Sequence, residues 1–444
     1  MTRRVETTGA RAAGRVGLTS LAAGLWLMGV GLAGAAEFTQ YQPAEPEPGT
    51  ELPTATVNFG MRPYADNTFY VIAMKKGWFE EAGITIGPEE LGMKINDTNG
   101  TALLLNGQID IASQYCPLML PTYKTTDALK CIAFTDTFLG QAILANPKLG
   151  LKTVRQYIEE DGMSFEDAMK AAFEPLSGKT LVVPPQLSTR PFTDAASEFS
   201  GVDWDIQVLE DSKSLVLAKS GQIDFISPEG APVVYTLESA GWTKVLGIGD
   251  LYDYAPGGAA SPVAPLVAIV GIGANGEYVN ANQNTMLRFL SVVWRTIDAV
   301  KKDPSLYELQ APYLNSVAGT DLDAKGVEGT VNSLHPYAPF EAGKTYFEDP
   351  DSVLYYGNAW GAMIKEFVKN GIIPDEGLTP DDIVWAAAIW KQMEDYRAKS
   401  EKMIADLDGQ TLSDDKKALL DQAKSYYEKF NYLDAYRLAT AASS

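Results

Sequence analysis

The residue types that most often do chemistry in proteins are scarce in this sequence. The chain has one His, His335, and two Cys, Cys116 and Cys131. Because neither Cys lies near His335 in the sequence, neither a thiol–imidazole pair nor a His-based metal site is expected. In an oxidising compartment the two Cys would pair as a disulfide; otherwise they would pack as buried thiols. The sequence leaves both alternatives open, since it does not give the distance between their Cα atoms.

Motifs that would signal catalysis are also missing. There is no Gly-x-Ser-x-Gly elbow, no phosphate-cradling Gly-rich loop and no metal-ligand spacing. Carboxylates are numerous, and two of them facing each other would suit glycoside hydrolysis, but nothing in the sequence pairs them. We therefore expect no catalytic residue, no metal and no cofactor, and a chain that binds its ligand without changing it.

A four-residue segment occurs twice in the sequence, and each copy joins a predicted helix to a predicted strand. Gly-Gln-Ile-Asp occurs at residues 107–110 and again at residues 221–224. Each copy follows an apolar-patterned helix, and its Gly suits the left-handed position that ends a helix. A short buried strand begins inside each copy, at Ile109 or Ile223, runs to Ala112 or Ile226, and ends on Ser113 or Ser227. Two matching helix–Gly–strand units predict two similar α/β lobes that face each other; the alternative is a chance similarity of two αβ corners.

Length and charge narrow the class of protein. The 444 residues, 46% of them hydrophobic, suffice for two or three domains with a sizeable core. Residues 1–36 have a basic start, an apolar stretch and a small-residue end, the layout of a secretory signal peptide; a retained membrane anchor is the alternative. Removing them leaves 32 basic and 56 acidic side chains, a net charge of −24. Nucleic acid is therefore excluded as a partner, and no second apolar run is long enough to span a membrane.

The first part of the mature chain carries the motif that points to a family. Residues 54–61 alternate as a strand, a polar turn follows, and a predicted helix begins near Thr68. The run Lys-Lys-Gly-Trp-Phe-Glu-Glu-Ala-Gly-Ile at residues 75–84 then resembles the opening of periplasmic substrate-binding proteins of the NMT1/THI5-like group. That group serves ABC importers for sulfonates, nitrate, thiamine precursors and similar small molecules.

The resemblance implies an α/β fold of the type II periplasmic-binding-protein class, with two lobes. Each lobe would be a mixed sheet flanked by helices, and extra helices would follow at the C-terminus, either packed on a lobe or available to a partner. The expected division is residues 1–36 for the signal peptide, 37–53 for an extended N-terminal arm, 54–137 and 256–378 for lobe I, 138–255 for lobe II, and 379–444 for a C-terminal helical extension.

Loop position selects the candidate ligand-binding residues. In such sheets the loops at the carboxyl ends of the strands converge, and two facing lobes place them on both walls of a cleft. The predicted wall residues are Tyr64, Asp66, Asn67, Asn96, Thr98, Ser113, Gln114, Tyr115, Thr135, Gln186, Ser188, Thr189, Glu229 and Asp253. The hydroxyl and amide residues among them suit helix caps equally well.

The sequence thus predicts an exported, periplasmic solute-binding protein that passes a small organic molecule to an ABC transporter permease. Acidic residues and tyrosines in the candidate loops favour a neutral or cationic ligand with a flat part over sulfonate or nitrate. One alternative is a module that presents its ligand to a membrane sensor. Another is an enzyme similar to the group's eukaryotic pyrimidine synthase, which uses a Cys-rich iron-binding run and several His that this chain lacks.

Overall fold

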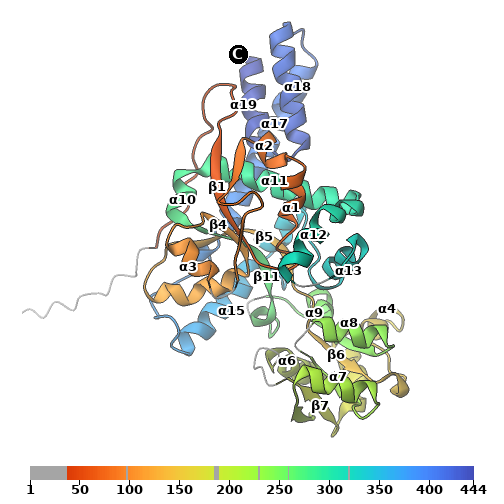
Figure 1. Cartoon of the computed structure of the whole chain (residues 1–444). Coiled ribbons are helices and arrows are strands. Elements are labelled where there is room, and N and C mark those ends of the chain that lie inside the picture. Colours follow the sequence, from red (N-terminus) through yellow and green to blue (C-terminus); the bar gives the residue numbers. More distant parts are fainter. Residues whose placement is uncertain (1–37, 97–98, 185–189, 229–230, 259, 319–320) are drawn as a thin grey trace, which may run out of the picture. The chain divides into compact units, whose positions relative to one another are not determined.

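The first of two sheets contains the first copy of the repeated unit. The computed structural model describes residues 38–96, 99–184, 190–228, 231–258, 260–318 and 321–444, so the predicted signal peptide lies outside it. The sheet runs in the order β2 (Ile84–Gly87), β1 (Ala55–Met61), β4 (Ile111–Gln114), β11 (Ile269–Asn275) and β5 (Leu129–Thr137), and β3 (Met93–Lys94) also pairs with β1 (Figure 1). β1 is parallel to β2, β3 and β4, whereas β11 is antiparallel to β4 and β5.

The second sheet repeats this topology. Its order is β8 (Asp205–Val208), β7 (Thr180–Val183), β9 (Phe225–Ile226), β6 (Ala142–Ala145) and β10 (Thr243–Gly247). β7 is parallel to β8 and β9, whereas β6 is antiparallel to β9 and β10. Order and direction match the first sheet strand for strand, and this agreement confirms the predicted two-lobed α/β fold with a mixed sheet in each lobe.

The two copies of the repeated segment occupy equivalent places. α3 (Gly100–Leu105) precedes β4, and α7 (Asp211–Lys219) precedes β9. Gly107 and Gly221 have φ angles of 65° and 75°, the left-handed region that Gly adopts without steric penalty. The amide of the next residue, Gln108 or Gln222, donates to a helix carbonyl at 3.0 Å in both copies. The strands begin two residues later than predicted, because Ile109 and Ile223 still belong to the irregular segment between helix and strand.

Helices cover both sheets. Around the first sheet lie α1 (Tyr70–Lys75), α2 (Trp78–Glu81), α10 (Gly276–Ala281), α11 (Gln283–Lys302), α12 (Tyr307–Ala318), α13 (Ala324–Leu334), α14 (Gly343–Phe347) and α15 (Tyr356–Lys369). The second lobe has α4 (Val154–Glu159), α5 (Phe165–Phe173), α6 (Arg190–Ser200), α8 (Ala231–Ser239) and α9 (Ile248–Tyr254). In the core of the first lobe, the rings of Phe59, Tyr70 and Phe79 surround Phe289 of α11 at centroid distances of 5.1 to 6.4 Å.

Two chain segments connect the sheets. Residues 138–141 lead from β5 to β6, and residues 255–268 lead from α9 to β11. The two segments are bonded to each other, since the amide of Phe138 donates to the carbonyl oxygen of Ala268 at 2.9 Å. They therefore form a double connection between the lobes.

The C-terminal helices pack on the first lobe. They are α16 (Pro380–Ile383), α17 (Ala386–Asp408), α18 (Asp414–Glu428) and α19 (Tyr432–Ser443), drawn in blue in Figure 1. Val384 bridges to Cys131 of β5, and the ammonium group of Lys130 donates to the Asp382 carbonyl at 2.7 Å. The N-terminal arm, from residue 38 to residue 53, lies against these helices, and Arg437 of α19 donates to three carbonyl groups of the arm. The exact division into lobes remains a prediction.

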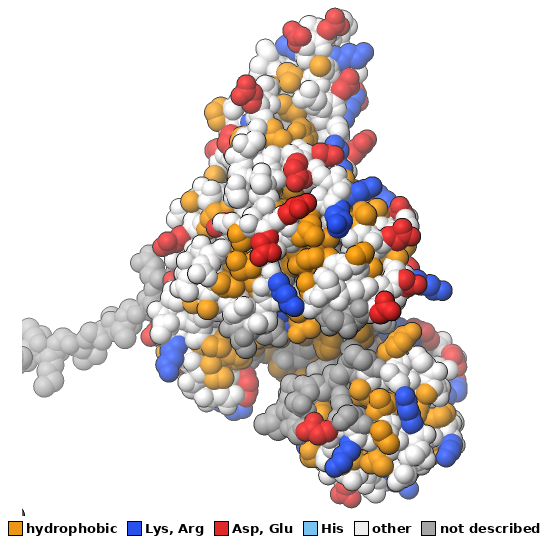
Figure 2. Space-filling model, viewed as in Figure 1, with side chains coloured by type: hydrophobic (Ala, Val, Ile, Leu, Met, Phe, Trp, Pro, Cys, Tyr) orange, Lys and Arg blue, Asp and Glu red, His pale blue; other side chains and the backbone are white. Residues whose placement is uncertain are grey.

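The outer surface is mixed in charge. Acidic side chains are interspersed with Lys and Arg over the visible face (Figure 2). Within the ranges that the structure describes, every helix is too short or too polar to cross a bilayer.

Candidate functional site

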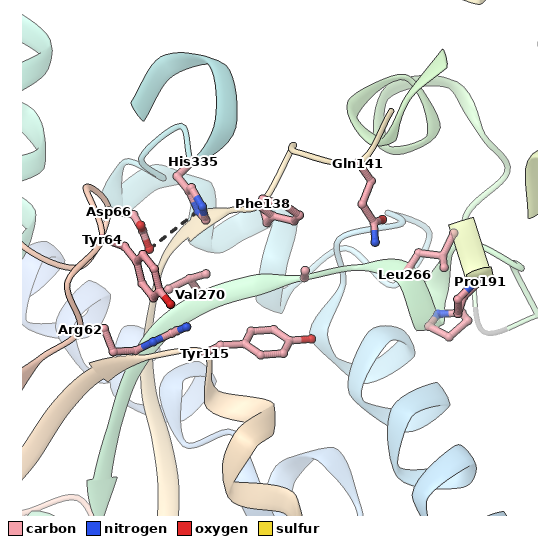
Figure 3. Close-up of a pocket in the computed structure, with 12 residues that line it drawn as sticks. Arg62, Tyr64, Asp66, Tyr115, Phe138, Gln141, Pro191, Leu266, Val270 and His335 are labelled. Carbon is pink, nitrogen blue, oxygen red and sulfur yellow. Dashed lines mark ion pairs between the residues drawn. The ribbon is translucent and has the colours of Figure 1, made fainter. Parts of the chain in front are cut away.

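A cavity of about 400 Å³ lies where the two connecting segments meet the first sheet. Its walls come from the loops after β1 and β4, from both connecting segments, from the start of α6 and from the segment after α13 (Figure 3). The lining residues are Arg62, Tyr64, Asp66, Tyr115, Phe138, Gln141, Pro191, Pro265, Leu266, Ala268, Val270 and His335. We call this cavity the interlobe pocket.

The sequence places these residues together through strand ends. β1 ends at Met61 and β4 ends at Gln114, and the two strands are parallel neighbours. Loops that leave parallel strands at their carboxyl ends open onto the same edge of the sheet. Tyr64 and Asp66 in the first loop therefore face the same space as Tyr115 in the second, as Figure 3 shows.

His335 reaches the pocket by an extra strand-like pairing. Residues 335–338 follow α13 and run along the end of β5. The amide of Leu139 donates to the Leu334 carbonyl at 2.7 Å, and the amide of Ala338 donates to the Thr135 carbonyl at 2.8 Å. These bonds hold His335 beside Asp136, 199 residues earlier in the chain.

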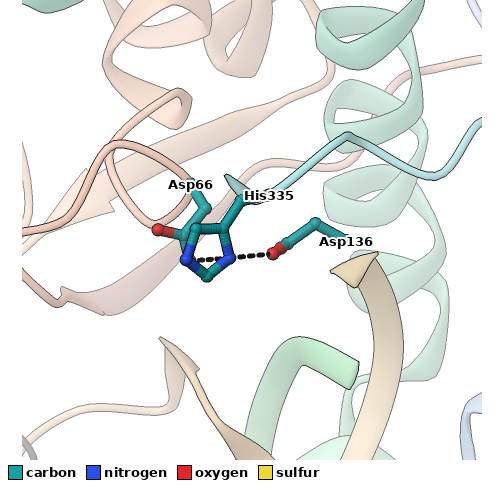
Figure 4. A group of neighbouring side chains, drawn as sticks. All are labelled: Asp66, Asp136 and His335. Atoms are coloured by element: carbon teal, nitrogen blue, oxygen red, sulfur yellow. Dashed lines mark hydrogen bonds and ion pairs between the residues drawn. The ribbon is translucent and has the colours of Figure 1, made fainter. Parts of the chain in front are cut away.

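The His335 ring lies between two carboxyl groups (Figure 4). Its Nδ1 atom is 2.8 Å from Oδ2 of Asp136 and 3.8 Å from Oδ2 of Asp66. Both carboxyl groups are almost completely buried, at 0% and 2% side-chain exposure. We call Asp66, Asp136 and His335 the polar cluster. It forms one end of the pocket, because Asp66 and His335 both line the cavity.

Burial and mutual charge shift the pKa values of two members of the cluster. Burial raises the pKa of Asp66 to about 6; the charges of His335 and Arg62 oppose the rise and that of Asp136 adds to it. Burial lowers the pKa of His335, but the two carboxylates more than offset it and raise the value to about 8. A buried charge is stable only with partners of opposite sign, which this arrangement supplies.

Hydrogen bonds behind the cluster fix most of its oxygen atoms. The Thr135 hydroxyl donates to Oδ1 of Asp136 at 2.9 Å. The Asn67 amide donates to Oδ2 of Asp66, and the Ser113 hydroxyl donates to the Asn67 carbonyl oxygen at 3.1 Å. Oδ1 of Asp66, in contrast, is buried and has no hydrogen-bond partner among the residues that the structure describes. A buried oxygen atom without a hydrogen-bond partner raises the free energy of the folded protein, so a ligand that interacts with this atom would be bound favourably.

Aromatic rings make up much of the rest of the wall. The guanidinium group of Arg62 stacks over the Tyr64 ring at 4.8 Å, and Tyr64 itself is 47% exposed. The rings of Phe138 and His335 lie 5.1 Å apart. Burial raises the pKa of Tyr115 to about 12, so its hydroxyl stays protonated and can donate a hydrogen bond.

The predicted wall residues fall into four groups. Tyr64, Asp66 and Tyr115 line the pocket. Residues directly behind its wall are buried and bonded into the network described above; they are Asn67, Ser113 and Thr135. Gln114 is also buried. Predicted residues that fall outside the described ranges are Thr98, Gln186, Ser188, Thr189 and Glu229.

Two predicted residues serve other contacts. Asn96 exchanges hydrogen bonds with Asn99, its side-chain oxygen accepting from the Asn99 amide at 3.0 Å, and so stabilises the start of α3. Asp253 pairs with Arg155 at the surface of the second lobe, and neither residue lines the pocket. Loop position alone placed both on the wall, but their side chains satisfy neighbouring groups instead.

Sequence reasoning missed several lining residues, above all His335, Arg62 and Phe138. The sequence predicts no site at His335 because no Cys lies near it, whereas its partners in the structure are two Asp far away in the chain. Phe138 begins the first connecting segment, and Arg62 immediately follows β1. The run Phe-Thr-Asp-Thr at residues 134–137, just before that connection, was the available signal for this part of the pocket.

The two Cys are free and completely buried in this structure. Cys131 donates weakly to the Ala133 carbonyl, with its sulfur 3.7 Å from the oxygen. Burial, and then the neighbouring Cys116, raise the pKa of Cys131 well above its ordinary value. The arrangement corresponds to the buried-thiol alternative.

Two lobes of one topology, joined by a double connection that lines a pocket, define the periplasmic-binding-protein fold. Residues 50–193 match the model of the NMT1-like family, which confirms the resemblance predicted from the run at residues 75–84. No curated protein matches the chain.

Solved structures with a similar arrangement include binding proteins and an enzyme. The periplasmic aliphatic sulphonate binding protein SsuA from Escherichia coli is 14% identical over 76% of this chain and 99% of its own, with a TM-score of 0.48. The periplasmic nitrate-binding protein NrtA from Synechocystis PCC 6803 is 14% identical over 79% and 89%, with a TM-score of 0.41. The desulfurization enzyme DSZB is 11% identical over 76% and 98%, with a TM-score of 0.44. At such identities a ligand does not transfer from one protein to another.

Proposed function

We propose that this chain is a periplasmic solute-binding protein that captures a small organic molecule in the interlobe pocket and delivers it to an ABC importer. The observation that carries the proposal is the pocket itself, about 400 Å³ in volume, with apolar walls and a polar cluster at one end. Small-molecule sites typically have this size and this mixture of an apolar lining with a few placed polar groups. Export through cleavage of residues 1–36 belongs to the same proposal.

The residues that line the interlobe pocket indicate which side chains contact the bound small molecule, which we call the guest. We assign Tyr64, Asp66 and Tyr115 as ligand-binding residues, as the sequence predicted, and add Phe138 and Leu266. The three aromatic rings would contact a flat or apolar part of the guest, and Leu266 would extend the apolar wall. Asp66 would accept a hydrogen bond from the polar end of the guest, because its Oδ1 atom has no partner among the described residues.

Charge balance favours a neutral or cationic guest. The polar end brings two carboxyl groups, those of Asp66 and Asp136, next to the His335 imidazole and the Arg62 guanidinium. Two acidic and two basic side chains thus face one another there, and neither type is in excess. Sulfonate or nitrate would need positive charge in excess of this pairing. A pyrimidine or an amine with a flat part fits the balance better.

Delivery requires no chemistry on the guest. A guest that contacts both lobes binds one arrangement of the lobes more tightly than another, and that difference in affinity shifts the population. A permease can then distinguish the loaded protein from the empty one. The guest therefore leaves unchanged, and the protein is not an enzyme under this proposal.

Mass spectrometry of the small molecules that copurify with the protein tests the proposal. Ala268→Trp fills the pocket with an indole, and Ala398→Trp places the same group at an exposed position of α17 as a matched control. We expect one neutral or cationic compound with the wild type and with Ala398→Trp, and none with Ala268→Trp. A compound retained equally by all three proteins would reject the pocket as the binding site.

A further inference from the structure

The polar cluster has the donor set of a metal site. Asp66 and Asp136 each offer a carboxylate oxygen, and His335 offers Nδ1, the nitrogen that faces both of them. These three atoms all lie within 4.8 Å of one another. One imidazole nitrogen with two carboxylate oxygens suits borderline divalent ions such as zinc better than hard ions such as magnesium.

The distances are close to those that an ion would impose. Zinc binds imidazole nitrogen and carboxylate oxygen at about 2.0 Å, so two of its tetrahedral ligands lie about 3.3 Å apart. The two measured separations from Nδ1, 2.8 Å and 3.8 Å, lie on either side of that value. Shifts of about half an ångström would bring these two separations to that value, and the two carboxylate oxygens, which lie within 4.8 Å of each other, would also have to approach.

A second and independent observation points to a missing partner at this place. Asp66 is 2% exposed, lines the pocket and keeps Oδ1 buried without a hydrogen-bond partner among the described residues. Oδ2 of Asp66 already accepts from Asn67, and Oδ1 of Asp136 already accepts from Thr135. Such outer hydrogen bonds orient the carboxylates of metal sites.

We propose that Asp66, Asp136 and His335 bind one divalent transition-metal ion of the zinc class at the polar end of the interlobe pocket. Three protein ligands leave at least one coordination position free, and it faces the cavity that Asp66 and His335 line. A nitrogen or oxygen atom of the guest fills that position. The inference rests on the proposed function of the same pocket, whose charge balance was argued for the pocket without an ion. A bound divalent ion makes the polar end more positive, so the free position suits a neutral guest with a nitrogen or oxygen donor. Ion binding by the protein alone does not depend on the identity of the guest.

Binding of zinc to the chelator-treated full chain, measured by calorimetry without any organic guest, tests the inference. We expect one ion per chain, no comparable binding of magnesium, and affinity reduced roughly 10–100-fold or more in Asp136→Asn and in His335→Gln. Asp298→Asn, at the exposed pair with Lys302, is the matched control and should bind like the wild type. Cobalt substitution gives a second readout, since its visible absorption reports the geometry and ligands of the bound ion and should change in His335→Gln.

The outcomes separate this inference from the proposed function. Absence of zinc binding in the wild type, or equal zinc affinity in all variants, overturns the metal site even if an organic guest binds. Zinc binding that depends on Asp136 and His335 supports the metal site even if the organic panel fails. Thermal unfolding of each variant shows that a loss of binding does not come from a loss of fold.

Discussion

Arg288 of α11 and Asp434 of α19 form a buried two-point ion pair, with nitrogen–oxygen distances of 2.8 and 2.9 Å. Their side chains are only 2% and 1% exposed. Glu47 of the N-terminal arm also contacts Arg288, and Arg437 contacts Asp434. The group thus ties both ends of the described chain to the first lobe, which makes the C-terminal helices part of the lobe's structure.

Breaking this pair should destabilise the protein strongly. Arg288→Met keeps most of the side-chain volume but leaves Asp434 with less positive charge, and removing one partner of a buried pair typically costs about 3 kcal/mol or more. Urea unfolding measures the loss. Lys302→Met, at the exposed Lys302–Asp298 pair, should change the free energy of unfolding by less than about 1 kcal/mol. Equal effects of the two substitutions would contradict a structural role for the buried pair.

The Arg288–Asp434 pair should make the free energy of unfolding depend on pH in the acidic range. Burial raises the pKa of Asp434, but its hydrogen bonds and ion pairs, chiefly with Arg288, outweigh this and hold the pKa below its ordinary value. A lowered folded-state pKa stabilises the protein above the unfolded-state value, about 3.9, and this contribution is lost as pH falls through the lower folded-state value.

We therefore expect the double variant Arg288→Met, Asp434→Asn to lose less stability than the wild type when the pH is lowered from 7 to 3. Urea midpoints at the two pH values give the comparison. Parallel losses in the two proteins would show that other carboxylates dominate acid unfolding.

Thiol titration should decide between the two alternatives for Cys116 and Cys131. Both are buried, and burial raises the pKa of Cys131, so neither supplies an accessible thiolate. We expect a maleimide to label no thiol in the folded protein and two after unfolding without reductant. If the unfolded, unreduced protein shows no reactive thiol, the two Cys are paired as a disulfide instead.

Guest binding should bring the lobes into one arrangement. The substitutions Lys219→Cys on α7 and Lys302→Cys on α11 place one spin label on each lobe at exposed positions, while the native Cys remain buried. Electron–electron distance measurement should give a narrower and shorter distribution when the copurifying guest is added. An unchanged distribution with a bound guest would reject closure, and Ala268→Trp should not respond at all.

Local sequence patterns predicted more of the fold than of the candidate site. The repeated Gly-Gln-Ile-Asp segments and the run at residues 75–84 are local signals, and they gave two lobes of one topology. Strand starts shifted by two residues because the turn after Gly107 is longer than the apolar pattern suggests. Tyr64, Asp66 and Tyr115 reached the pocket because each sits just after a parallel strand.

His335 could not be found in this way. Its place beside Asp136 depends on the bridge between Asp136 and Tyr337, a contact across about 200 residues that leaves no periodic signal in either segment. Asp253, predicted from loop position, forms an ion pair with Arg155 at the surface and does not line the pocket. Such side-chain pairs form only in the tertiary structure, so the position of a loop in the sequence does not predict them.

The measurement that tests the central claim most directly is calorimetric titration of the wild type with pyrimidines, amines and sulfonates, followed by chemical analysis of the recovered compound. We predict one neutral or cationic compound bound per chain and recovered unchanged, with affinity at least a hundredfold lower in Ala268→Trp and unaltered in Ala398→Trp. Tight binding of sulfonates alone would contradict the charge argument. Binding that survives Ala268→Trp, or conversion of the compound, would contradict the account of a pocket that holds a guest and releases it intact.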